Sequence, residues 1–363
     1  MPAANDQHRI PAPQLESLIT SIFAAAGCDA AESRRIATHL LGANLAGHDS
    51  HGVIRVPRYV EWLEAGYVLK GQSIETVTDG GAFALVDGGY GFGQTVAPQA
   101  VALGIERAGQ HGIAVIGLRH AGHIGRVGAY AEAAIEAGLV SVHFVNVAGS
   151  TLVAPFGGTE RRFSTAPFSV GVPLPGRPLV LDFATSLVAE GKVLVASNGG
   201  KPLPEGALIE PGGRLSTDPR TLYGDFAPTG PRNPTAGPGA IRAFGEHKGS
   251  GLAFMCEMLA GALTGGGTSG PVAERARISN GMLSLYLSPD AFGTRAEFEA
   301  AGRAYVDWVL AANPATPGEP VLAPGDKEAA TRADRLAHGL PLTPETWESI
   351  LAVARRLGVA TPG

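Results

Sequence analysis

The chain has 363 residues, of which 45% are hydrophobic and 17% are charged. It is therefore too apolar for a disordered chain and long enough for two lobes or one large α/β body. The 51 Gly and 27 Pro residues follow no collagen-like repeat, and a net charge of −5 without a basic tail argues against nucleic acid as a partner.

Helical periodicity dominates the first part of the chain. Apolar residues recur at three-to-four spacing over 15–23 and 36–45, and a third short helix is predicted over 56–64, ending at Gly66. From about residue 74 the pattern changes to short apolar runs separated by helical stretches, which is typical of a sheet with crossover helices. The predicted strands are 83–86, 113–118 and 139–147, and the helices between them are 95–108 and 126–137.

Residues 155–245 are rich in Gly, Pro and Thr, which indicates irregular structure near a functional site. Strands are predicted in the second half of the chain over 169–172, 179–183 and 282–287. Helices are predicted there over 186–196, 248–263, 296–311, 327–337 and 345–357. Thr343 is the expected N-cap of the last helix, with Pro344 at its first position.

The cysteines and the apolar segments bear on the cellular compartment. Cys28 and Cys256 form no Cys-x-x-Cys pattern, which favours a reducing environment. No apolar segment near the N-terminus is long enough for a signal core, and the apolar stretch 252–263 is too short to cross a bilayer. We therefore expect a cytoplasmic protein with no membrane partner.

The polar segment from His48 to Arg55 is the most informative part of the sequence. The imidazole of His51 can exchange a proton with a hydroxyl or carbonyl oxygen near neutral pH, and Arg55 offers a planar fork for a carboxylate. Together they suit a 2-oxo acid. The structural alternative is that Asp49 and Ser50 cap a helix while His51 fills space. No Gly-x-Ser-x-Gly elbow surrounds Ser50, so a hydrolase has little support.

Glycines at 122, 125 and 128 lie between a predicted strand and a predicted helix. Such a turn presents backbone N–H groups that suit a phosphate, but its spacing differs from the Rossmann fingerprint. The only literal fingerprint, 265–270, follows a helix and is interpreted as a loop. His120 and His123 lack further ligands at suitable spacing, so no metal site is predicted.

Three further segments combine ambiguous signals. Asp182, at the end of a predicted strand, can orient a histidine, hold a sugar hydroxyl or cap a helix. His247 and Lys248 open the long helix, where anions bind or where a simple helix boundary lies. Gly325 and Asp326 are ordinary turn and cap residues when considered alone.

Taken in order, these segments resemble those of the malate/L-lactate dehydrogenase family of NAD(P)-dependent oxidoreductases, which is distinct from the Rossmann lactate and malate dehydrogenases. The likeness runs nearly end to end, and within the family the chain most resembles hydroxycarboxylate dehydrogenases of the B type. The segments are Gly47-His48-Asp49-Ser50-His51-Gly52-Val53, Gly91-Phe92-Gly93-Gln94, Gly122-His123-Ile124-Gly125-Arg126, Ala154-Pro155-Phe156-Gly157-Gly158, Asp182-Phe183-Ala184-Thr185-Ser186, His247-Lys248-Gly249 and Pro324-Gly325-Asp326.

The resemblance implies an α/β fold in which a non-Rossmann, cofactor-binding sheet domain lies beside a helical lobe. It also implies a homodimer that binds the dinucleotide between the two lobes. We expect an N-terminal helical lobe over 1–75, a sheet-containing cofactor- and substrate-binding domain over 76–290, and C-terminal helices over 291–363 that pack on the helical lobe.

By the same resemblance, His51 is the acid/base group, relayed through Ser50 and Asp182, while Arg55 binds the substrate carboxylate and His123 lines the catalytic site. The residues implied in cofactor binding are His51, Gly125, Arg126, Val127, Leu181, Asp182, Phe183, Ala184, His247, Asn280, Gly325, Asp326, Lys327 and Glu328. NAD is the expected cofactor, because the type that the chain most resembles uses it and the chain has no obvious basic cluster for a 2′-phosphate; NADP is the alternative.

The expected reaction is reversible hydride transfer between a nicotinamide cofactor and a small 2-oxo or 2-hydroxy carboxylate, with charged His51 donating the proton during reduction. The nearest alternatives are a reductase of cyclic imines such as piperideine-2-carboxylate and a ureidoglycolate dehydrogenase. A Ser50, His51 and Asp182 hydrolase is the alternative from another class. Two departures from the family pattern, Ala166 for a common Asn and Ser250 for a frequent aromatic residue, alter an amide contact and the local packing.

Overall fold

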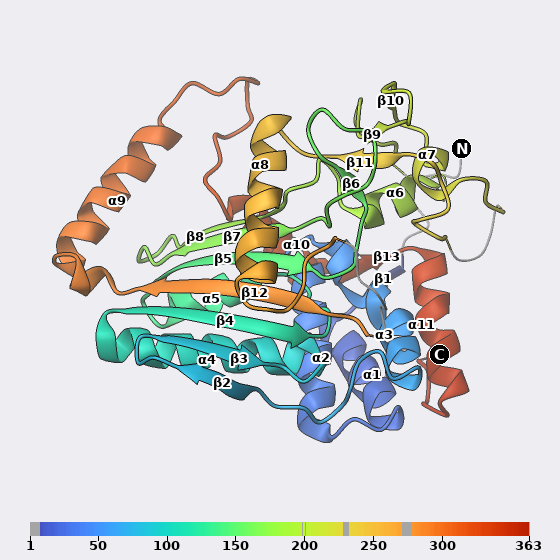
Figure 1. Ribbon diagram of the computed structural model, residues 1–363, viewed down its shortest axis with the longest axis horizontal. Helices are drawn as coiled ribbons and strands as arrows, with labels where there is room; N and C mark the ends of the chain where they lie inside the picture. Colours follow the sequence, from blue (N-terminus) through green and yellow to red (C-terminus); the bar gives the residue numbers. More distant parts are fainter. Residues whose placement is uncertain (1–7, 198, 200, 228–231, 271–276, 363) are drawn as a thin grey trace.

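The computed structural model describes residues 8–197, 199, 201–227, 232–270 and 277–362, so the first seven residues of the predicted helical lobe lie outside the described residues. The α-helices are α1 (Ala12–Ala25), α2 (Ala30–Leu45), α3 (Val56–Glu64), α4 (Gly93–His111), α5 (Gly128–Glu136), α6 (Glu190–Ser197), α7 (Arg220–Tyr223), α8 (His247–Cys256), α9 (Arg295–Leu310), α10 (Asp326–His338) and α11 (Pro344–Arg356) (Figure 1). The strands are β1 (His8–Ile10), β2 (Glu75–Asp79), β3 (Phe83–Asp87), β4 (Ile113–Ala121), β5 (Val140–Val147), β6 (Val153–Ala154), β7 (Pro167–Val172), β8 (Leu179–Ala184), β9 (Leu208–Ile209), β10 (Leu215–Ser216), β11 (Ala240–Arg242), β12 (Asn280–Leu287) and β13 (Leu340–Leu342).

The helical lobe is built from α1, α2 and α3, as their periodicity predicts. One face of α1 is apolar and buries Leu15, Ile19 and Ile22 completely, against a matching face of α2. Gly66, just beyond α3, has a φ of +71°, the left-handed conformation expected at the end of a helix. The last helix, α11, packs on α1 and α3, and β1 pairs with β13, so the two ends of the described chain meet in this lobe.

A seven-stranded mixed sheet forms the second lobe, in the order β2-β3-β4-β12-β5-β7-β8. Only β3 and β4 pair in parallel, with α4 as the crossover helix between them, and the other neighbours are antiparallel. The late strand β12 inserts between β4 and β5. With β12 inserted, the sheet is antiparallel except for β3 and β4, and so differs from the doubly wound parallel sheet to which the Rossmann fingerprint belongs.

A small sheet that the sequence patterns do not predict, in the order β10-β9-β11-β6, is formed by strands of the irregular region 155–245 and by β6 just before it. Its strands are two or three residues long, too short to carry a periodic signal. The helix predicted over 186–196 begins later, at Glu190. The helix predicted over 248–263 is α-helical only to Cys256 and continues as a π-helix over Glu257–Ala262, where the buried Glu257 carboxylate accepts hydrogen bonds from Asn146, Ser164 and the Ser269 backbone.

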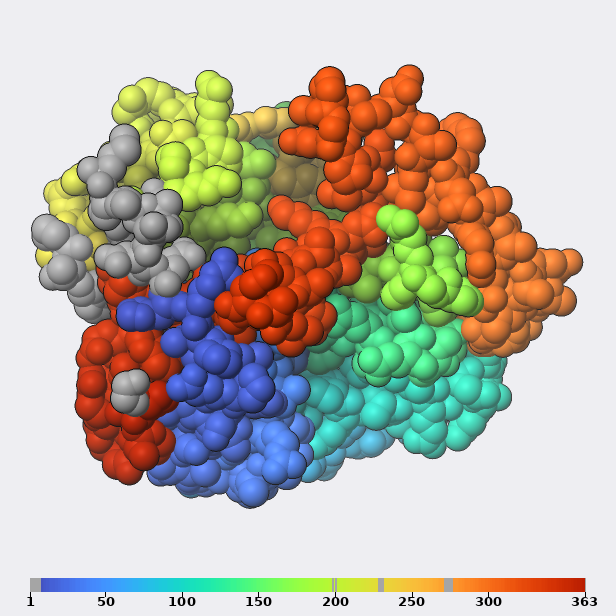
Figure 2. All heavy atoms as spheres, turned by 180° about the vertical axis from the view of Figure 1, so that it is seen from behind, coloured from blue at the N-terminus to red at the C-terminus, as the bar shows by residue number. Residues whose placement is uncertain are grey.

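The C-terminal segment is not one packed unit. Seen from behind, α10 crosses between the helical lobe and the sheet (Figure 2). By contrast, α9 lies at the opposite end of the molecule from α1, α3 and α11, and only Val306 of α9 is buried (Figure 1). Its large aromatic residues Tyr305 and Trp308 are 66% and 73% exposed, so most of the apolar surface of this helix faces outward. The boundaries at residues 75 and 290 stay predictions.

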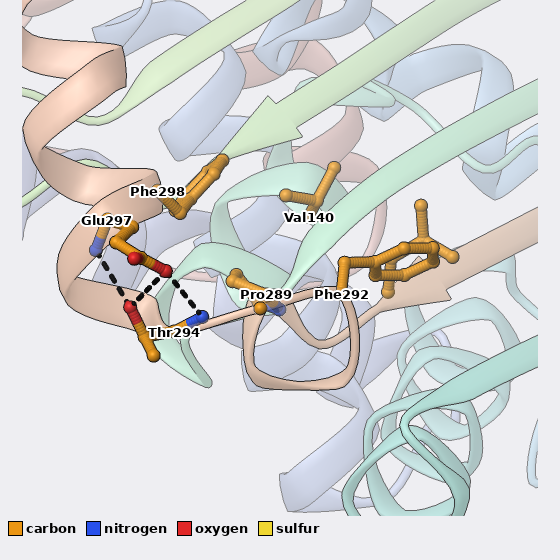
Figure 3. A pocket seen from close by; sticks show the side chains of 8 residues that line it. Val140, Pro289, Phe292, Thr294, Glu297 and Phe298 are labelled. Carbon is orange, nitrogen blue, oxygen red and sulfur yellow. Dashed lines mark hydrogen bonds between the residues drawn. The ribbon is translucent and has the colours of Figure 1, made fainter.

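A cavity of about 380 Å³ lies where α9 begins, lined by Val140, Pro289, Phe292 and Phe298 (Figure 3). The Thr294 to Glu297 capping box closes one side of it. It adjoins Leu287, the last residue of β12, and so lies at the opposite end of the central strands from Asn280 and the loop after β4. Within the described ranges, no helix is both long and apolar enough to span a bilayer.

Candidate active site

The segment 48–55 forms two 3-10 turns, η1 (Asp49–His51) and η2 (Val53–Arg55), between α2 and α3. Asn44 in the last turn of α2 holds both turns. Its amide donates to Asp49 Oδ1 at 2.6 Å, and its Oδ1 accepts the Val53 N–H at 2.7 Å. Gly52 is required beside it, because a Cβ there would lie 2.0 Å from Asn44 Oδ1. A buried local amide therefore sets the shape of the turn.

The C-terminal helix α10 fastens the same turn from the other side. Arg335 donates to both carboxylate oxygens of Asp49, at 2.5 and 3.0 Å, and to the Asn44 carbonyl at 2.5 Å. Planar two-point pairing of this kind fixes geometry as well as charge. The turn is thus anchored by residues almost 300 positions apart.

Two histidines from distant segments meet as parallel rings. The centroids of His51 and His123 lie 5.6 Å apart with 7° between the ring planes. Ser50 Oγ is 3.1 Å from His51 Nδ1, and Arg55 Nε donates to the Ser50 carbonyl at 2.6 Å. Both imidazoles are half-buried, and in the described part of the chain neither Nε2 has a hydrogen-bond partner. The structure therefore brings Ser50, His51, Arg55 and His123 together with two ring nitrogens free.

The electrostatics of the site keep both imidazoles neutral. Burial, reinforced by the Arg55 cation, lowers the pKa of His51 to about 3. The same two causes, in the same order, lower the pKa of His123 well below its ordinary value. In the ligand-free site at pH 7, His51 is therefore neutral and not charged. A substrate carboxylate placed on Arg55 offsets that cation and raises the pKa of His51 again.

Asp182, the third member of the predicted relay, lies elsewhere. It accepts the Gly128 N–H at 2.9 Å, and its Oδ2 is 3.4 Å from Arg126 Nε and 3.9 Å from His48 Nδ1. No hydrogen bond joins it to Ser50 or His51, all of which are described residues. Burial raises the pKa of the Asp182 carboxyl, and the His48 and Arg126 charges oppose the change. The Asp182 carboxylate thus contacts the loop before α5 and not the Ser50–His51 pair.

That loop, 122–127, is shaped by residues beneath it. Asn280 is buried, accepts the Ile124 N–H at 3.1 Å and donates to the Asn146 carbonyl at 2.7 Å, so both ends of its amide are occupied. Gly125 has a φ of +73°, and a Cβ there would lie 2.5 Å from His39 Nε2. Asn280 therefore shapes the loop through its hydrogen bond to the Ile124 backbone.

Polar atoms around this loop are buried without hydrogen bonds. They are His39 Nε2, Gln94 Oε1, and Nε and Nη2 of Arg126. Arg126 forms ion pairs, with its Nη2 2.8 Å from Glu132, but neither its Nε nor its Nη2 has the geometry of a hydrogen bond. Buried unsatisfied groups are costly. Their concentration beside the N-terminus of α5 indicates where a polar ligand or ordered water completes the structure.

The predicted cofactor residues at the start of α10 lie beside β8, the strand at one edge of the large sheet. The Val180 N–H donates to the Pro324 carbonyl at 3.2 Å, which places Gly325 next to the strand that carries Leu181 to Ala184. Asp326 accepts from Arg177 at 2.6 Å, and Glu328 lies 3.4 Å from His48. Lys327 and His247 are both exposed, and the His247 ring lies edge-on to the Phe156 ring with 5.8 Å between the centroids.

The two departures from the family pattern have local consequences. Ala166 is buried with a φ of +30°, and its carbonyl accepts a hydrogen bond from Thr185 Oγ1 at 2.9 Å. Ser250 Oγ accepts the Phe156 N–H at 2.9 Å, a backbone contact that an aromatic side chain cannot make. Ser250 therefore holds the loop that carries Phe156, the ring beside His247.

Sequence reasoning assigned no role to several residues that complete the site. The Tyr59 hydroxyl lies 2.5 Å from His123 Nδ1, and Gln94 donates to that hydroxyl at 3.1 Å. Gly191, at the start of α6, lies so close to Ser50 that a Cβ would be 2.7 Å from the Ser50 Cβ. The neighbouring Glu190 accepts from Tyr223 at 2.6 Å. Only the Gly91-Phe92-Gly93-Gln94 motif signalled any of these residues beforehand.

Comparison with known proteins agrees with this architecture. A family model described as malate/L-lactate dehydrogenase matches residues 10–351. The chain belongs to the malate/L-lactate dehydrogenase family. Its relatives in the family include hydroxycarboxylate dehydrogenase B of Escherichia coli K12, which is 41% identical over 97% of this chain and 95% of that protein. A Delta(1)-pyrroline-2-carboxylate/Delta(1)-piperideine-2-carboxylate reductase of Pseudomonas putida is 36% identical over 73% of this chain and 74% of its own.

A solved structure from the same family matches the whole fold. The structure of a putative malate/lactate dehydrogenase from Escherichia coli superposes with a TM-score of 0.88 at 41% identity, covering 97% of this chain and 96% of that chain. The predicted family and the predicted α/β family fold are thereby confirmed, including the sheet that lacks a Rossmann fingerprint.

Proposed function

We propose that this protein is a nicotinamide-dependent oxidoreductase that interconverts 2-oxo and 2-hydroxy carboxylates. The observation that carries the proposal is the pairing of His51 with His123 as parallel rings, with Arg55 beside them, in a chain of the malate/L-lactate dehydrogenase family. These groups match the needs of the reaction: a cation for the carboxylate, a proton donor or acceptor for the reacting oxygen, and a second imidazole to hold that oxygen.

Arg55, His51 and His123 have separate roles in the proposed reaction. Arg55 binds the substrate carboxylate and so sets which carbon faces the reactive ring. His51 gives a proton to the carbonyl oxygen in reduction and removes it from the hydroxyl in oxidation. His123 lies against His51 and hydrogen-bonds the same oxygen. The hydrolase alternative lacks its orienting acid, because Ser50 contacts His51 but Asp182 contacts His48, Arg126 and Gly128.

The residues present fit a dinucleotide. The loop 122–127 ends at the N-terminus of α5, and the unsatisfied groups of Arg126 and His39 surround it. Gly125 to Val127, Leu181 to Ala184 and Gly325 to Glu328 would hold the cofactor, together with His51 and His247. When bound, a nicotinamide ring supplies or accepts the hydride.

The neutral state of the ligand-free site has a consequence for the proton. Because the pKa of His51 is about 3 there, oxidation finds the base ready at pH 7, whereas reduction requires a proton taken up from solvent when the anionic 2-oxo acid binds. We expect proton uptake on binding a non-reactive 2-oxo acid analogue to the cofactor complex, measured by calorimetry in buffers of different ionisation enthalpy. Binding without proton uptake would contradict the role of Arg55 in setting this pKa.

The activity itself is tested by following reduced nicotinamide absorbance with a panel of 2-oxo acids. The His51→Ala variant should lose about 10²- to 10⁴-fold in rate, the range of general acid catalysis. His111→Ala, at the exposed end of α4, is the matched control and should behave as the wild type. Retention of most activity in His51→Ala would remove that imidazole from the mechanism.

The carboxylate clamp has its own test. The Arg55→Met variant should raise KM for 2-oxo acids by about 10- to 100-fold, the value of a charge-assisted hydrogen bond. A neutral ketone of similar size should be affected much less. Arg58→Met, three residues on at the exposed face of α3, is the control. Equal losses for acid and ketone would show that Arg55 serves the fold and not the carboxylate.

The same panel decides between neighbouring chemistries and cofactors. It includes a cyclic imine carboxylate, because a relative is named as a reductase of that class and Arg55 suits either carboxylate. A ureidoglycolate oxidation arm covers the other alternative. NAD is the proposed cofactor, because Arg177, the cation beside the start of α10, is already paired with Asp326 and so is not free for a 2′-phosphate. A lower KM for NADPH than for NADH would overturn that preference.

The proposal includes a cytoplasmic homodimer. Phe254, Met255 and Met258 on α8 and its π extension are about half exposed, an apolar face that a second copy of the chain would cover. The free, buried cysteines Cys28 and Cys256 suit a reducing compartment. Sedimentation should show a dimer that Met258→Glu weakens. An active monomer at assay concentration would refute the dimer.

A further inference from the structure

A chain of buried hydrogen bonds reaches the candidate site from α4. Gln94 and Tyr59 are 1% and 2% exposed. Gln94 Nε2 donates to the Tyr59 hydroxyl at 3.1 Å and to the His123 carbonyl at 2.9 Å. The Tyr59 oxygen lies 2.5 Å from His123 Nδ1. The three residues come from α4, α3 and the loop after β4, so the sequence does not place them together.

The direction of this chain follows from its donors. The amide nitrogen of Gln94 can only donate, so the Tyr59 oxygen accepts and its own proton must be directed elsewhere. Two acceptors are near: His123 Nδ1 at 2.5 Å and the His123 carbonyl at 3.5 Å, which is too long for a good bond. Tyr59 therefore donates to Nδ1, and the neutral His123 ring carries its proton on Nε2.

The surroundings keep this arrangement stable at neutral pH. Burial raises the pKa of Tyr59, so its hydroxyl keeps the proton that it donates. Burial and the Arg55 cation keep His123 neutral. The Nε2–H of His123 has no protein partner among the described residues and is not sealed from solvent. By contrast, His51 Nδ1 contacts the Ser50 hydroxyl, which can donate or accept, so its tautomer is not locked.

We propose that Tyr59, oriented by Gln94, is a positioning residue that locks His123 as the Nε2-protonated neutral tautomer, making His123 a fixed hydrogen-bond donor to the substrate oxygen. The inference rests on the proposed oxidoreductase function and divides the two stacked rings into distinct roles. His123 donates a hydrogen bond without titrating, while His51 exchanges the proton. A neutral imidazole fixed in this way stabilises charge that develops on the oxygen during hydride transfer.

The decisive variant reverses the direction of these hydrogen bonds with a side chain of the same size and shape. Gln94→Glu replaces the amide donor with a carboxylate acceptor, so the Tyr59 hydroxyl turns toward it and accepts from His123 Nδ1–H instead. This change removes the proton from Nε2. We expect about a 10²-fold or greater loss of kcat, the effect of deleting one donor to a developing oxyanion, with KM for the 2-oxo acid changed much less. Gln99→Glu adds the same charge five residues along α4, where Gln99 already acts as an acceptor for the Ile74 N–H, and is the matched control.

The tautomer is read directly in ¹⁵N-histidine-labelled protein by two-bond proton–nitrogen NMR correlations at pH 8, with the His123 signals identified by their loss in His123→Gln. The wild type should show His123 as the pure Nε2–H form, and Gln94→Glu should show the Nδ1–H form. Should Gln94→Glu fail to fold, Tyr59→Phe serves instead and should release the ring into a mixture of tautomers with a smaller loss of kcat. Tyr286→Phe, which removes another buried hydroxyl in β12, should leave both spectrum and rate unchanged.

Either of two results overturns the inference: a wild-type His123 protonated on Nδ1, or a reversed tautomer accompanied by an unchanged kcat. The spectrum needs no turnover, so it separates this inference from the proposed function. A wild type that shows the Nε2–H tautomer but reduces no 2-oxo acid or imine refutes the proposed reaction, and with it the donor role of His123.

Discussion

The contact between α6 and the catalytic turn makes Gly191→Ala a sharp test of the site. A Cβ at residue 191 would lie 2.7 Å from the Ser50 Cβ, whereas ordinary contacts begin at 3.4 Å, so the two segments must separate by about 0.7 Å. Gly191 is buried, and Ser50 has no flexible side-chain end that could absorb the shift. The displacement therefore passes to the backbone of η1.

Both functional contacts of Ser50 depend on that backbone position. Its hydroxyl is 3.1 Å from His51 Nδ1, and its carbonyl accepts from Arg55 Nε at 2.6 Å. A misplacement near 1 Å commonly costs about 10²-fold in rate, which corresponds to about 2.7 kcal/mol in the activation free energy. We expect a fall of that size in kcat/KM for the 2-oxo acid. The overpacking itself should lower the free energy of unfolding by about 1–3 kcal/mol.

The assay combines steady-state kinetics with thermal melting and NADH binding measured by fluorescence. The Kd for NADH should change much less than kcat/KM, because, of the proposed cofactor residues, only His51 lies in η1. Gly109→Ala, on α4 with no atom within 4 Å of the added Cβ, is the control. It should keep its activity and gain about 0.5–1 kcal/mol in stability. A folded Gly191→Ala enzyme with kcat/KM within twofold of wild type would refute the argument that α6 positions the turn.

Two further predictions concern buried polar groups. His143, fully buried between Ser284 Oγ at 2.8 Å and Ser141 Oγ at 3.1 Å, has its pKa lowered by burial to about 3. The unfolded chain takes up its proton near pH 6.5 while the folded protein does not, so stability is complete above that pH and falls as the pH decreases toward 3, by about 2 kcal/mol at pH 5. Urea unfolding measures the fall in stability between pH 7.5 and pH 5. In His143→Gln that fall should be smaller than in the wild type by about 2 kcal/mol, and an equal fall in both proteins would contradict the prediction. Asn44→Ala should lower stability by about 1–3 kcal/mol and reduce kcat/KM further than melting explains, because both turns of 48–55 lose their anchor; normal kinetics in a destabilised protein would show that the turn holds its shape without Asn44.

The local sequence predicted most of the longer helices and the segment in which the candidate site lies. The third helix was predicted over 56–64 and runs over Val56–Glu64, because apolar spacing, an early proline and a terminal glycine all act within a few residues. The concentration of polar residues over 48–55 likewise pointed to His51 and Arg55 as candidate functional residues, but not to the two 3-10 turns that carry them. Motif resemblance then supplied the family, which periodicity alone could not.

Tertiary structure alone decided which residues face one another. The insertion of β12 between β4 and β5, the position of Asp182 against His48 and Arg126, and the contact of Gly191 with Ser50 all join segments far apart in the chain. The Gln94–Tyr59–His123 chain and the lowered pKa of His51 arise in the same way. Strand partners, burial and hydrogen-bond direction depend on residues far apart in the chain. The sequence therefore shows which chemical groups are present, and only the packed fold sets their pKa values and partners.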